Sequence, residues 1–445
     1  MSGAVSIIGA GLAGCEAAWA LAQRGVAVTL YEMKPQKFSP AHHSSGFAEL
    51  VCSNSLKAAR LESAAGLLKA EMRKMGSLIL ACADQCAVPA GGALAVDRDI
   101  FSALVTEKVR SHPLITVIEG EITALPETGA VIVATGPLTS DALSEAIAQK
   151  TGAERLSFYD AAAPIVEFSS VDMTKAFFAA RYGRGEDDYI NCPMNKEQYE
   201  TFLEALTSAE RAELHGFEKL TVYEGCMPVE VLASRGKDAI RYGPMKPVGL
   251  TDPATGRRPW AVVQLRAENR EGTLYNLVGF QTNLKFGEQK RVFSLIPGLE
   301  NAVIARYGVM HRNTFLKSPG LLDETFQMKE QPDLYFAGQM TGVEGYVESA
   351  GSGLVAGTSL AERLSGREAP IFPRATALGA MAHYISTPVR DFQPMNCCFG
   401  LIESLPVEPG KKPIRNKVQR YEAVAARSLA IIRDMASKMR VLDIA

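Results

Sequence analysis

The chain has 445 residues, of which 47% are hydrophobic and 22% are charged, and its formal net charge is −2. This length predicts two or three domains with ample buried core, and the nearly balanced charge argues against a wholesale attraction to nucleic acid. No apolar run approaches the roughly 18 residues that a membrane span needs. The first motif lies so near the N-terminus that we expect no signal peptide, and the eight scattered cysteines are typical of a reduced, cytoplasmic protein.

The first predicted unit, residues 4–32, is a strand, a turn, a helix and a second strand. An apolar strand, Val5–Ile8, enters the turn, an Ala-rich helix runs to Arg24, Gly25 ends it, and the second strand closes on Glu32. The turn is a G-x-G-x-x-G fingerprint made of Gly9, Ala10, Gly11, Leu12, Ala13 and Gly14. These glycines permit the tight turn, the approach of a pyrophosphate and the packing of helix on strand. Glu32 stands where a carboxylate accepts a hydrogen bond from the adenosine ribose, so the unit predicts an FAD or NAD site.

A second strand-like run, Ala130–Pro137, ends in a small-residue turn at Thr135 and Gly136. It is typical of a further strand of the same nucleotide-binding domain. Because Thr135 and Gly136 are small residues at the end of this strand, we expect the cofactor to pass close to their backbone.

A third segment, Asp333–Leu360, places a strand, Leu334–Ala337, before a glycine-rich loop. We expect the following helix to begin near Gly351 and Gly353, with its N–H groups directed at an isoalloxazine carbonyl. FAD therefore fits better than NAD, because it must stretch from the first turn to this loop. Where such flavoproteins usually carry Gly-Asp to hold the ribityl chain, this sequence has Gly338 and Gln339, and the amide of glutamine can still bond a hydroxyl group.

The predicted fold is α/β, a Rossmann-like parallel-sheet FAD-binding domain of the two-dinucleotide-fold flavoprotein type with an α+β insertion domain. We expect the N-terminal part of the FAD-binding domain over 1–165, the insertion over 166–304, and the C-terminal part with terminal helices over 305–445. The insertion carries no second G-x-G-x-x-G, so a nicotinamide reductant would dock transiently. The expected elements are strands Leu220–Tyr223, Trp260–Leu265, Tyr275–Gly279 and Val303–Met310, and helices Lys196–His215 and Asn416–Met439.

Residues 230–320 hold 14 Lys and Arg against 7 Asp and Glu, a local excess of seven positive charges. This excess is typical either of a solvated basic face or of a phosphate-binding surface. Composition does not choose between them. No metal site is predicted, because Cys82 and Cys86 have no partner Cys or His pair nearby.

Three motifs carry a more specific signal: Cys52–Lys57 (CSNSLK), Glu224–Pro228 (EGCMP) and the loop Gly338–Leu354. With them the chain resembles, over essentially its full length, the folate- and FAD-dependent tRNA uracil-5 methyltransferases, which form ribothymidine in the T-loop. The resemblance implies that carbon passes from 5,10-methylenetetrahydrofolate through FAD to the tRNA uracil, with electrons from NAD(P)H. A larger wobble-uridine carboxymethylaminomethyl flavoprotein shares the FAD portion but normally carries a longer C-terminal region.

The chemistry implied by this resemblance needs two cysteines. Uracil C5 becomes nucleophilic only after a group adds at C6, and a thiolate is suited to add there and leave again. We expect Cys226 to be this nucleophile and Cys52 to accept the C5 proton or assist as a second thiol. Cys52 lies in a polar turn with the composition of a helix start, which would lower the pKa of a thiol. We assign the other cysteines to packing: Cys15, Cys82, Cys86, Cys192, Cys397 and Cys398.

Other candidates concern the cofactor, the folate and the tRNA. Tyr346 could stack on the isoalloxazine ring or be an ordinary packed loop residue. His311 could stack on a pterin and Arg312 could meet folate glutamate or phosphate, against the alternative of a plain hinge pair. Candidates for phosphate contact in the insertion are Lys285, Lys290, Arg291, Arg257 and Arg258.

Two alternatives belong to other functional classes. A general flavin oxidoreductase would use NAD(P)H and a small molecule, would turn over without tRNA or folate, and would not need Cys226. A non-catalytic FAD-sensing or RNA-binding protein would leave both cysteine motifs without a purpose. The third alternative is the wobble-uridine relative, which the absence of a long C-terminal extension disfavours.

Overall fold

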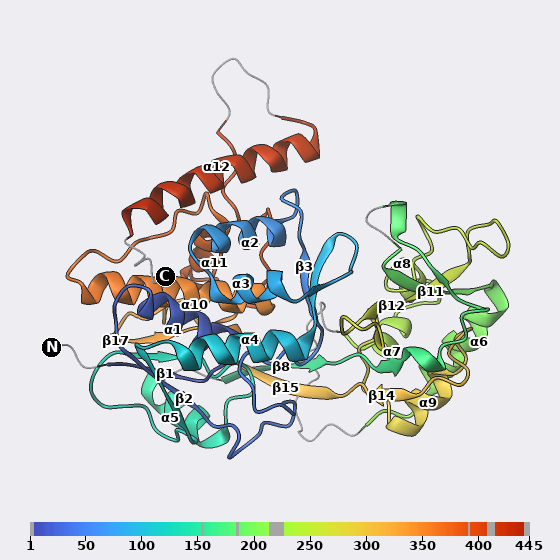
Figure 1. The fold of residues 1–445 in the computed structure, drawn as a ribbon, viewed down its shortest axis with the longest axis horizontal. Coiled ribbons are helices and arrows are strands. Elements are labelled where there is room, and N and C mark those ends of the chain that lie inside the picture. The colour runs from blue at the N-terminus through green and yellow to red at the C-terminus, as the bar shows by residue number, and fades with distance from the viewer. Residues whose placement is uncertain are drawn as a thin grey trace.

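The computed structural model describes residues 4–152, 155–183, 187–212, 227–389, 392–406 and 414–439, and it has two lobes that lie side by side (Figure 1). Within these residues the larger lobe is built on a sheet in the order β16-β17-β7-β1-β2-β6. All its neighbouring strands run parallel except the edge pair β16 and β17. The bounds are β1 Val5–Ile8, β2 Val28–Glu32, β6 Ile115–Glu119, β7 Val131–Val133, β16 Gln327–Met328 and β17 Gln331–Phe336.

Helices cover both faces of this sheet, as the apolar central strands require. Figure 1 shows α5 below the sheet, the other helices stacked above it, and α12 outermost. A small sheet in the order β3-β5-β4 borders the stack. The bounds are α1 Leu12–Ala22, α2 Ala64–Lys74, α3 Leu78–Gln85, α4 Arg98–Ser111, α5 Asp141–Thr151, α10 Tyr346–Leu364, α11 Ala377–Ser386, α12 Lys417–Lys438, β3 Ser55–Ala58, β4 Ala87–Val88 and β5 Ala93–Val96.

Two helices from opposite ends of the chain, α1 and α10, form the centre of the larger lobe. A Cβ added at Gly353 would lie 2.1 Å from the carbonyl oxygen of Ala13, and one added at Gly357 would lie 2.7 Å from that of Ala17. Only small residues allow this approach of two backbones. The Ala-rich sequence of α1 and the glycines of α10 are therefore matched surfaces, and they tie the N-terminal and C-terminal parts into one domain.

The second lobe contains a six-stranded antiparallel sheet among the described residues, in the order β10-β11-β12-β13-β9-β14. It has its own hydrophobic core, in which β12 is buried along its whole length. The bounds are β9 Ile165–Glu167, β10 Phe177–Phe178, β11 Tyr189–Met194, β12 Ala261–Ala267, β13 Leu274–Leu277, β14 Ile304–Arg306, α6 Lys196–Ser208, α7 Val229–Ala233, α8 Ala239–Tyr242 and α9 Phe286–Phe293, with short 3-10 turns η1 Phe168–Ser170 and η2 Arg181–Gly183.

The chain passes between the lobes on an antiparallel strand pair, β8 Arg155–Ala161 and β15 Met310–Leu316. Along the chain, the first strand of the second-lobe sheet is β9 and the last is β14. No described helix is long and apolar enough to cross a membrane.

The predicted βαβ unit and the C-terminal helix are present, three other expectations need correction, and one falls outside the described residues. The helix expected near Gly351 begins five residues earlier, at Tyr346, because Gly345 caps it and the glycines serve packing inside it. The helix expected to reach His215 ends at Ser208. The strand expected over Val303–Met310 is two strands, β14 and β15, with a break between them. The strand expected at Leu220–Tyr223 lies outside the described residues.

Candidate functional site

A groove follows the carboxyl ends of the adjacent parallel strands β1, β7 and β17, the edge at which open α/β sheets bind ligands. It consists of two adjoining cavities of about 90 Å³ and about 340 Å³. The first cavity lies at the end of β2 and is lined by Glu32 and Lys34. The second lies at the start of α10 and is lined by Cys52 and Tyr346. Both cavities share the residues Gly11, His42, Glu49, Ala134, Thr135 and Leu138.

The glycines of the first turn differ in what surrounds them. Gly9 has φ +100°, and a Cβ there would lie 2.7 Å from the carbonyl oxygen of Ala134. A Cβ at Gly14 would lie 1.8 Å from the carbonyl oxygen of Gly9. At Gly11, in contrast, a Cβ would meet nothing within 4 Å and would project into space shared by the two cavities. Gly9 and Gly14 thus shape the turn, while Gly11 leaves the groove open above it.

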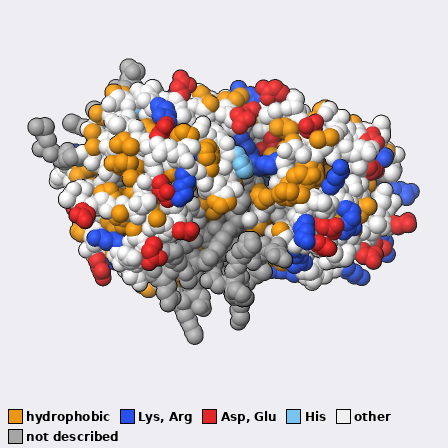
Figure 2. Space-filling model, turned by 90° about the horizontal axis from the view of Figure 1, so that it is seen from below, with side chains coloured by type: hydrophobic (Ala, Val, Ile, Leu, Met, Phe, Trp, Pro, Cys, Tyr) orange, Lys and Arg blue, Asp and Glu red, His pale blue; other side chains and the backbone are white. Residues whose placement is uncertain are grey.

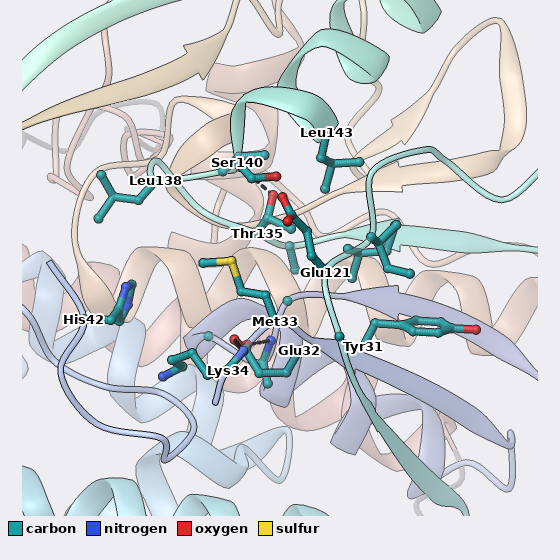
Figure 3. Close-up of a pocket in the computed structure, with 18 of the residues that line it drawn as sticks. Tyr31, Glu32, Met33, Lys34, His42, Glu121, Thr135, Leu138, Ser140 and Leu143 are labelled. Carbon is teal, nitrogen blue, oxygen red and sulfur yellow. Dashed lines mark hydrogen bonds between the residues drawn. The ribbon is translucent and has the colours of Figure 1, made fainter. Parts of the chain in front are cut away.

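Glu32 is buried at the end of β2 and braces the same turn. One carboxylate oxygen accepts from the backbone N–H of Ala10 at 2.8 Å, and the other accepts from that of Lys34 at 3.0 Å. Each oxygen keeps a further lone pair for a ligand hydroxyl. Figure 3 shows Glu32 and Lys34 on one wall of the first cavity, with Thr135, Ser140 and Leu143 on the facing wall.

Lys34 and His42, which the sequence reading did not single out, add polar groups to this cavity. The Lys34 ammonium donates to the carbonyl oxygen of Gly46 at 2.6 Å and lies 3.6 Å from a Glu49 carboxylate oxygen. Burial, with the charge of Lys34, lowers the pKa of His42, so the imidazole is neutral at pH 7. Lys34 stands two positions after Glu32, the acid that ends β2. Its place in the sequence is the signal that could have identified it.

The start of α10 forms one wall of the second cavity. Gly345 caps the helix with φ +112°, and a Cβ there would lie 2.4 Å from both the Lys57 ammonium and a Glu348 oxygen. Glu348 is fully buried, and its other oxygen accepts from Lys57 at 2.8 Å. The free N–H groups of the helix start favour an electron-rich ligand edge here, while the Lys57 ammonium donates to Glu348, to Asn396 and to the carbonyl oxygen of Glu344.

The departure from the usual Gly-Asp has a structural counterpart. The side-chain amide of Gln339 donates to a Glu344 carboxylate oxygen at 2.7 Å, and both residues line the second cavity. Gly338 is held in turn, since its N–H donates to the Ser352 hydroxyl at 2.7 Å. A carboxylate is thus present beside Gln339, the position of the usual Asp. It belongs to Glu344, five positions further along the chain.

Cys52 lies where the two lobes meet. Its sulfur is 3.0 Å from the hydroxyl of Tyr346. The neighbouring Asn54 is fully buried and donates to the carbonyl oxygen of Ala267 at 2.9 Å, while its own oxygen accepts from Arg266 at 3.0 Å. Strand β12 of the second lobe thereby fixes the cysteine motif against the second cavity.

The remaining predicted residues lie elsewhere. Cys226 is outside the described residues, as are the side chains of His311 and Arg312, whose backbones lie in β15. Gly351 contacts Leu378 in helix packing, and neither it nor Gly353 is among the described residues that line the groove.

The basic candidates lie on the second lobe, away from both cavities. Lys285 pairs with Glu210 at 2.7 Å, and Arg291 pairs with Glu288 at 2.6 Å. Lys290 is exposed on the same helix, α9, and Arg257 and Arg258 are exposed in a loop. Figure 2 shows Lys and Arg side chains interleaved with Asp and Glu over this lobe rather than gathered into one field.

Five of the six cysteines assigned to packing are buried, and burial raises the pKa of Cys82 and Cys192 to about 12. Cys398 is exposed, so its assignment to packing is wrong. Its neighbour Cys397 is buried, and the N–H of Cys397 donates to a Glu348 carboxylate oxygen at 3.1 Å. Within the described residues, no three His, Cys, Asp or Glu side chains converge as metal ligands would.

Comparison with known proteins gives a consistent result. Residues 4–368 match the family model described as glucose inhibited division protein A. The chain is 60% identical to the methylenetetrahydrofolate–tRNA-(uracil-5-)-methyltransferase TrmFO of Acetivibrio thermocellus, covering 98% of this chain and 99% of that protein. It is 59% identical to the protein of the same name from Bacillus subtilis, covering 97% and 98%. The solved structure of Aquifex aeolicus GidA superposes with a TM-score of 0.68 at 17% identity, covering 98% of this chain and 74% of that one, which is a likeness of fold.

Proposed function

The chain belongs to the glucose inhibited division protein A family, and we propose that it is a methylenetetrahydrofolate-dependent tRNA (uracil-5-)-methyltransferase. The observation that carries this proposal is the 60% identity to a bacterial enzyme of that name over 98% of this chain. The reaction transfers a one-carbon unit from 5,10-methylenetetrahydrofolate to C5 of a uridine, which we place in the T-loop of tRNA. Because tRNA is the substrate, we place the activity in the cytoplasm.

The groove fits FAD on a geometric observation. Gly11 leaves open space above the turn, and the cavities on either side of it form a path from Glu32 to the start of α10. When bound, FAD supplies the carrier for the one-carbon unit and for electrons. The turn from Gly9 to Gly14 would hold the pyrophosphate, Glu32 the ribose, and the backbone at Thr135 and Gly136 the middle of the cofactor.

The distal end of FAD would be held by residues of the C-terminal part. We propose that Gly338 and Gln339 orient the Glu344 carboxylate toward the ribityl hydroxyls. The N–H groups at the start of α10 would face the electron-rich edge of the flavin. Tyr346, the first residue of α10, borders the same space.

The two cysteines act on the uracil itself. The Cys226 thiolate adds to C6 and makes C5 nucleophilic, and it leaves when the C6–S bond breaks at the end of the reaction. Cys52, at the wall of the second cavity, accepts the proton from C5 after the new carbon is attached. Since chemistry at C5 needs the base outside its stack, the uridine must flip into this cavity.

The second lobe provides the surface for tRNA and folate in this proposal. Its candidates for phosphate contact are Lys285, Lys290 and Arg291. The candidates for folate, His311 and Arg312, lie on β15, which passes between the lobes. NAD(P)H supplies the electrons and docks transiently.

A carbon-labelling experiment tests the function. Purified protein receives unmodified tRNA, NADPH, and either labelled methylenetetrahydrofolate or labelled S-adenosylmethionine. We expect label in ribothymidine from the folate alone, and we expect Cys226→Ala to abolish it while FAD remains bound. NADPH oxidation without label from either donor would contradict the proposal and point to a general flavin oxidoreductase.

A further inference from the structure

The hydroxyl group of Tyr346 is enclosed by the Cys52 motif. Its oxygen accepts from the backbone N–H of Cys52 at 2.8 Å and is 3.3 Å from that of Ser53. The Cys52 sulfur lies 3.0 Å from the same oxygen. Because the two N–H groups occupy the lone pairs of the phenol oxygen, its hydrogen is left for the sulfur. Tyr346 is therefore the donor and Cys52 the acceptor.

This donor keeps its proton over a wide pH range. Tyr346 is half-buried at the wall of the second cavity, and the burial of its phenol together with the nearby Cys52 raises the pKa of that phenol well above the usual value. A neutral phenol stabilises a sulfur anion more than a neutral thiol, because a hydrogen bond to a charged acceptor is the stronger one. The contact thus favours the thiolate form of Cys52.

The charges around the motif favour the same form. Arg98 donates to the carbonyl oxygen of Leu50 at 2.5 Å, Arg306 donates to that of Val51 at 3.2 Å, and Arg266 donates to the Ser53 hydroxyl at 2.9 Å. Among the described residues, Glu268 is the carboxylate that faces this group, and it pairs with Arg98 at 2.5 Å. Three guanidinium groups against one carboxylate leave an excess of positive charge beside the sulfur.

The excess of positive charge affects the arginines themselves. Burial and the repulsion of Arg98 lower the pKa of the Arg306 guanidinium, and its buried Nε has no hydrogen-bond partner among the described residues. The other charged groups of the cavity wall have partners of their own: Glu49 pairs with Lys34, Lys57 pairs with Glu348, and Glu344 accepts from Gln339. A thiolate at Cys52 would supply the anion that these guanidinium groups lack.

We propose that Tyr346 is a positioning residue that holds the Cys52 side chain as a thiolate, oriented toward the second cavity. The inference rests on the proposed function, in which Cys52 accepts the C5 proton of uracil. In that step the C5–H bond breaks, an S–H bond forms, and the electron pair of the C–H bond stays with the uracil ring. Tyr346 keeps its own proton throughout, and the Cys52 thiol returns its proton to solvent before the next turnover.

The test measures the reactivity of Cys52 in the FAD-loaded enzyme without tRNA or folate. Iodoacetamide alkylation is followed by mass spectrometry of the Cys52 peptide over a series of pH values on both sides of neutrality. With Tyr346→Phe we expect the alkylation rate at neutral pH to fall about tenfold and the midpoint of the pH profile to rise. Arg306→Gln should move the midpoint in the same direction, because it removes positive charge.

Two controls frame this result. Tyr384→Phe removes a hydroxyl that donates to the Gln393 carbonyl at 2.6 Å, away from the cavity, and should leave the Cys52 profile unchanged. The exposed Cys398 serves as an internal reference in every sample. An unchanged Cys52 profile in Tyr346→Phe would overturn the inference, even if ribothymidine formation fell. Failure of the wild type to incorporate folate carbon would count against the proposed function, and the alkylation profile would be read separately.

Discussion

Gly11 and Gly14 stand in one turn, yet an added methyl group meets different surroundings at each. Gly14 touches the backbone of Gly9, so its lack of a side chain is a condition of folding. Gly11 has open space around it and an ordinary extended conformation, φ −75° and ψ −171°, which any residue can adopt. Its lack of a side chain serves a ligand instead. The two roles can be separated by mutation.

We predict that Gly11→Val folds but loses FAD. The valine side chain would fill the space above the turn, and the FAD content after purification should fall about tenfold or more, while the melting temperature of the apoprotein stays near that of the wild type. The ratio of flavin to protein absorbance and a thermal melt measure these two quantities. Gly14→Ala is the matched control and should lower stability by about 1–3 kcal/mol. Full FAD content in Gly11→Val would show that the pyrophosphate lies elsewhere.

Glu344 is a second residue whose expected role does not follow from the usual sequence motif. Its carboxylate replaces the missing Asp beside Gly338, and Gln339 orients it. We predict that Glu344→Gln raises the dissociation constant for FAD about tenfold, because a charge-assisted hydrogen bond becomes a neutral one. Titration of apoprotein with FAD measures this. The control Glu324→Gln breaks a pair with His383 on the surface and should leave FAD affinity as it is, and equal affinities in all three proteins would refute the role.

At the scale of elements, α10 is the helix whose start the sequence pattern predicted wrongly. Strand β1 and helix α1 could be predicted from the G-x-G-x-x-G fingerprint that joins them, and helix α12 from its amphipathic pattern and its cap at Asn416. Helix α10 is buried continuously from Val347 to Glu362, its polar residues included, which its sequence pattern does not indicate. Its glycines look like a loop but serve contacts with α1 and α11. Tertiary packing overrides local propensity there.

A buried carboxyl group joins three other helices and makes their stability depend on pH. Glu71 on α2 accepts from the N–H groups of Ala377 and Leu378 at 2.7 and 2.9 Å, at the start of α11, and from the hydroxyl of Ser428 on α12. Burial raises the pKa of Glu71 from 4.5 to about 7. The folded state therefore holds a proton that the unfolded chain releases, and the contribution of Glu71 to the free energy of unfolding falls as pH rises between those values.

We predict that Glu71→Gln flattens this dependence. The amount by which the wild type melts above the variant should be largest near pH 4.5 and should shrink toward pH 7, the window set by the raised pKa. Thermal melts of both FAD-loaded proteins over this range test it. A difference that stays constant or grows with pH would mean that Glu71 is ionised throughout.

At the scale of the whole molecule, the meeting of the lobes at Cys52 was beyond what the sequence could reveal. Arg266 holds Ser53 and Asn54 of the cysteine motif, and Arg306 holds the carbonyl oxygen of Val51 just before it; both arginines are more than 200 positions away in the chain. Spacing along a sequence carries no information about such a contact. The functional role expected for Cys52 came instead from the family resemblance of its motif. The FAD-binding turn, in contrast, could be predicted from physical reasoning alone.

The basic residues that give the second lobe its excess of positive charge differ in their surroundings. Lys285 and Arg291 form ion pairs with Glu210 and Glu288, so a phosphate must compete with a carboxylate for them. Lys290 lies between them on α9, is exposed, and has no ion-pair partner among the described residues. A phosphate contact here would release one condensed counterion without breaking an existing pair.

We therefore predict that Lys290→Gln lowers the magnitude of the slope of log K for tRNA binding against log salt by about one, and that Lys285→Gln lowers it by less. Binding of unmodified tRNA to the FAD-loaded protein over a salt series gives both slopes. Lys175→Gln, which removes a lysine paired with Glu300 at 2.8 Å, is the control for the loss of one charge anywhere on this lobe. If all three variants change the slope equally, the surface acts only through its net charge. If Lys290→Gln leaves the slope unchanged, α9 does not touch the tRNA backbone, and the basic excess is a solvated face.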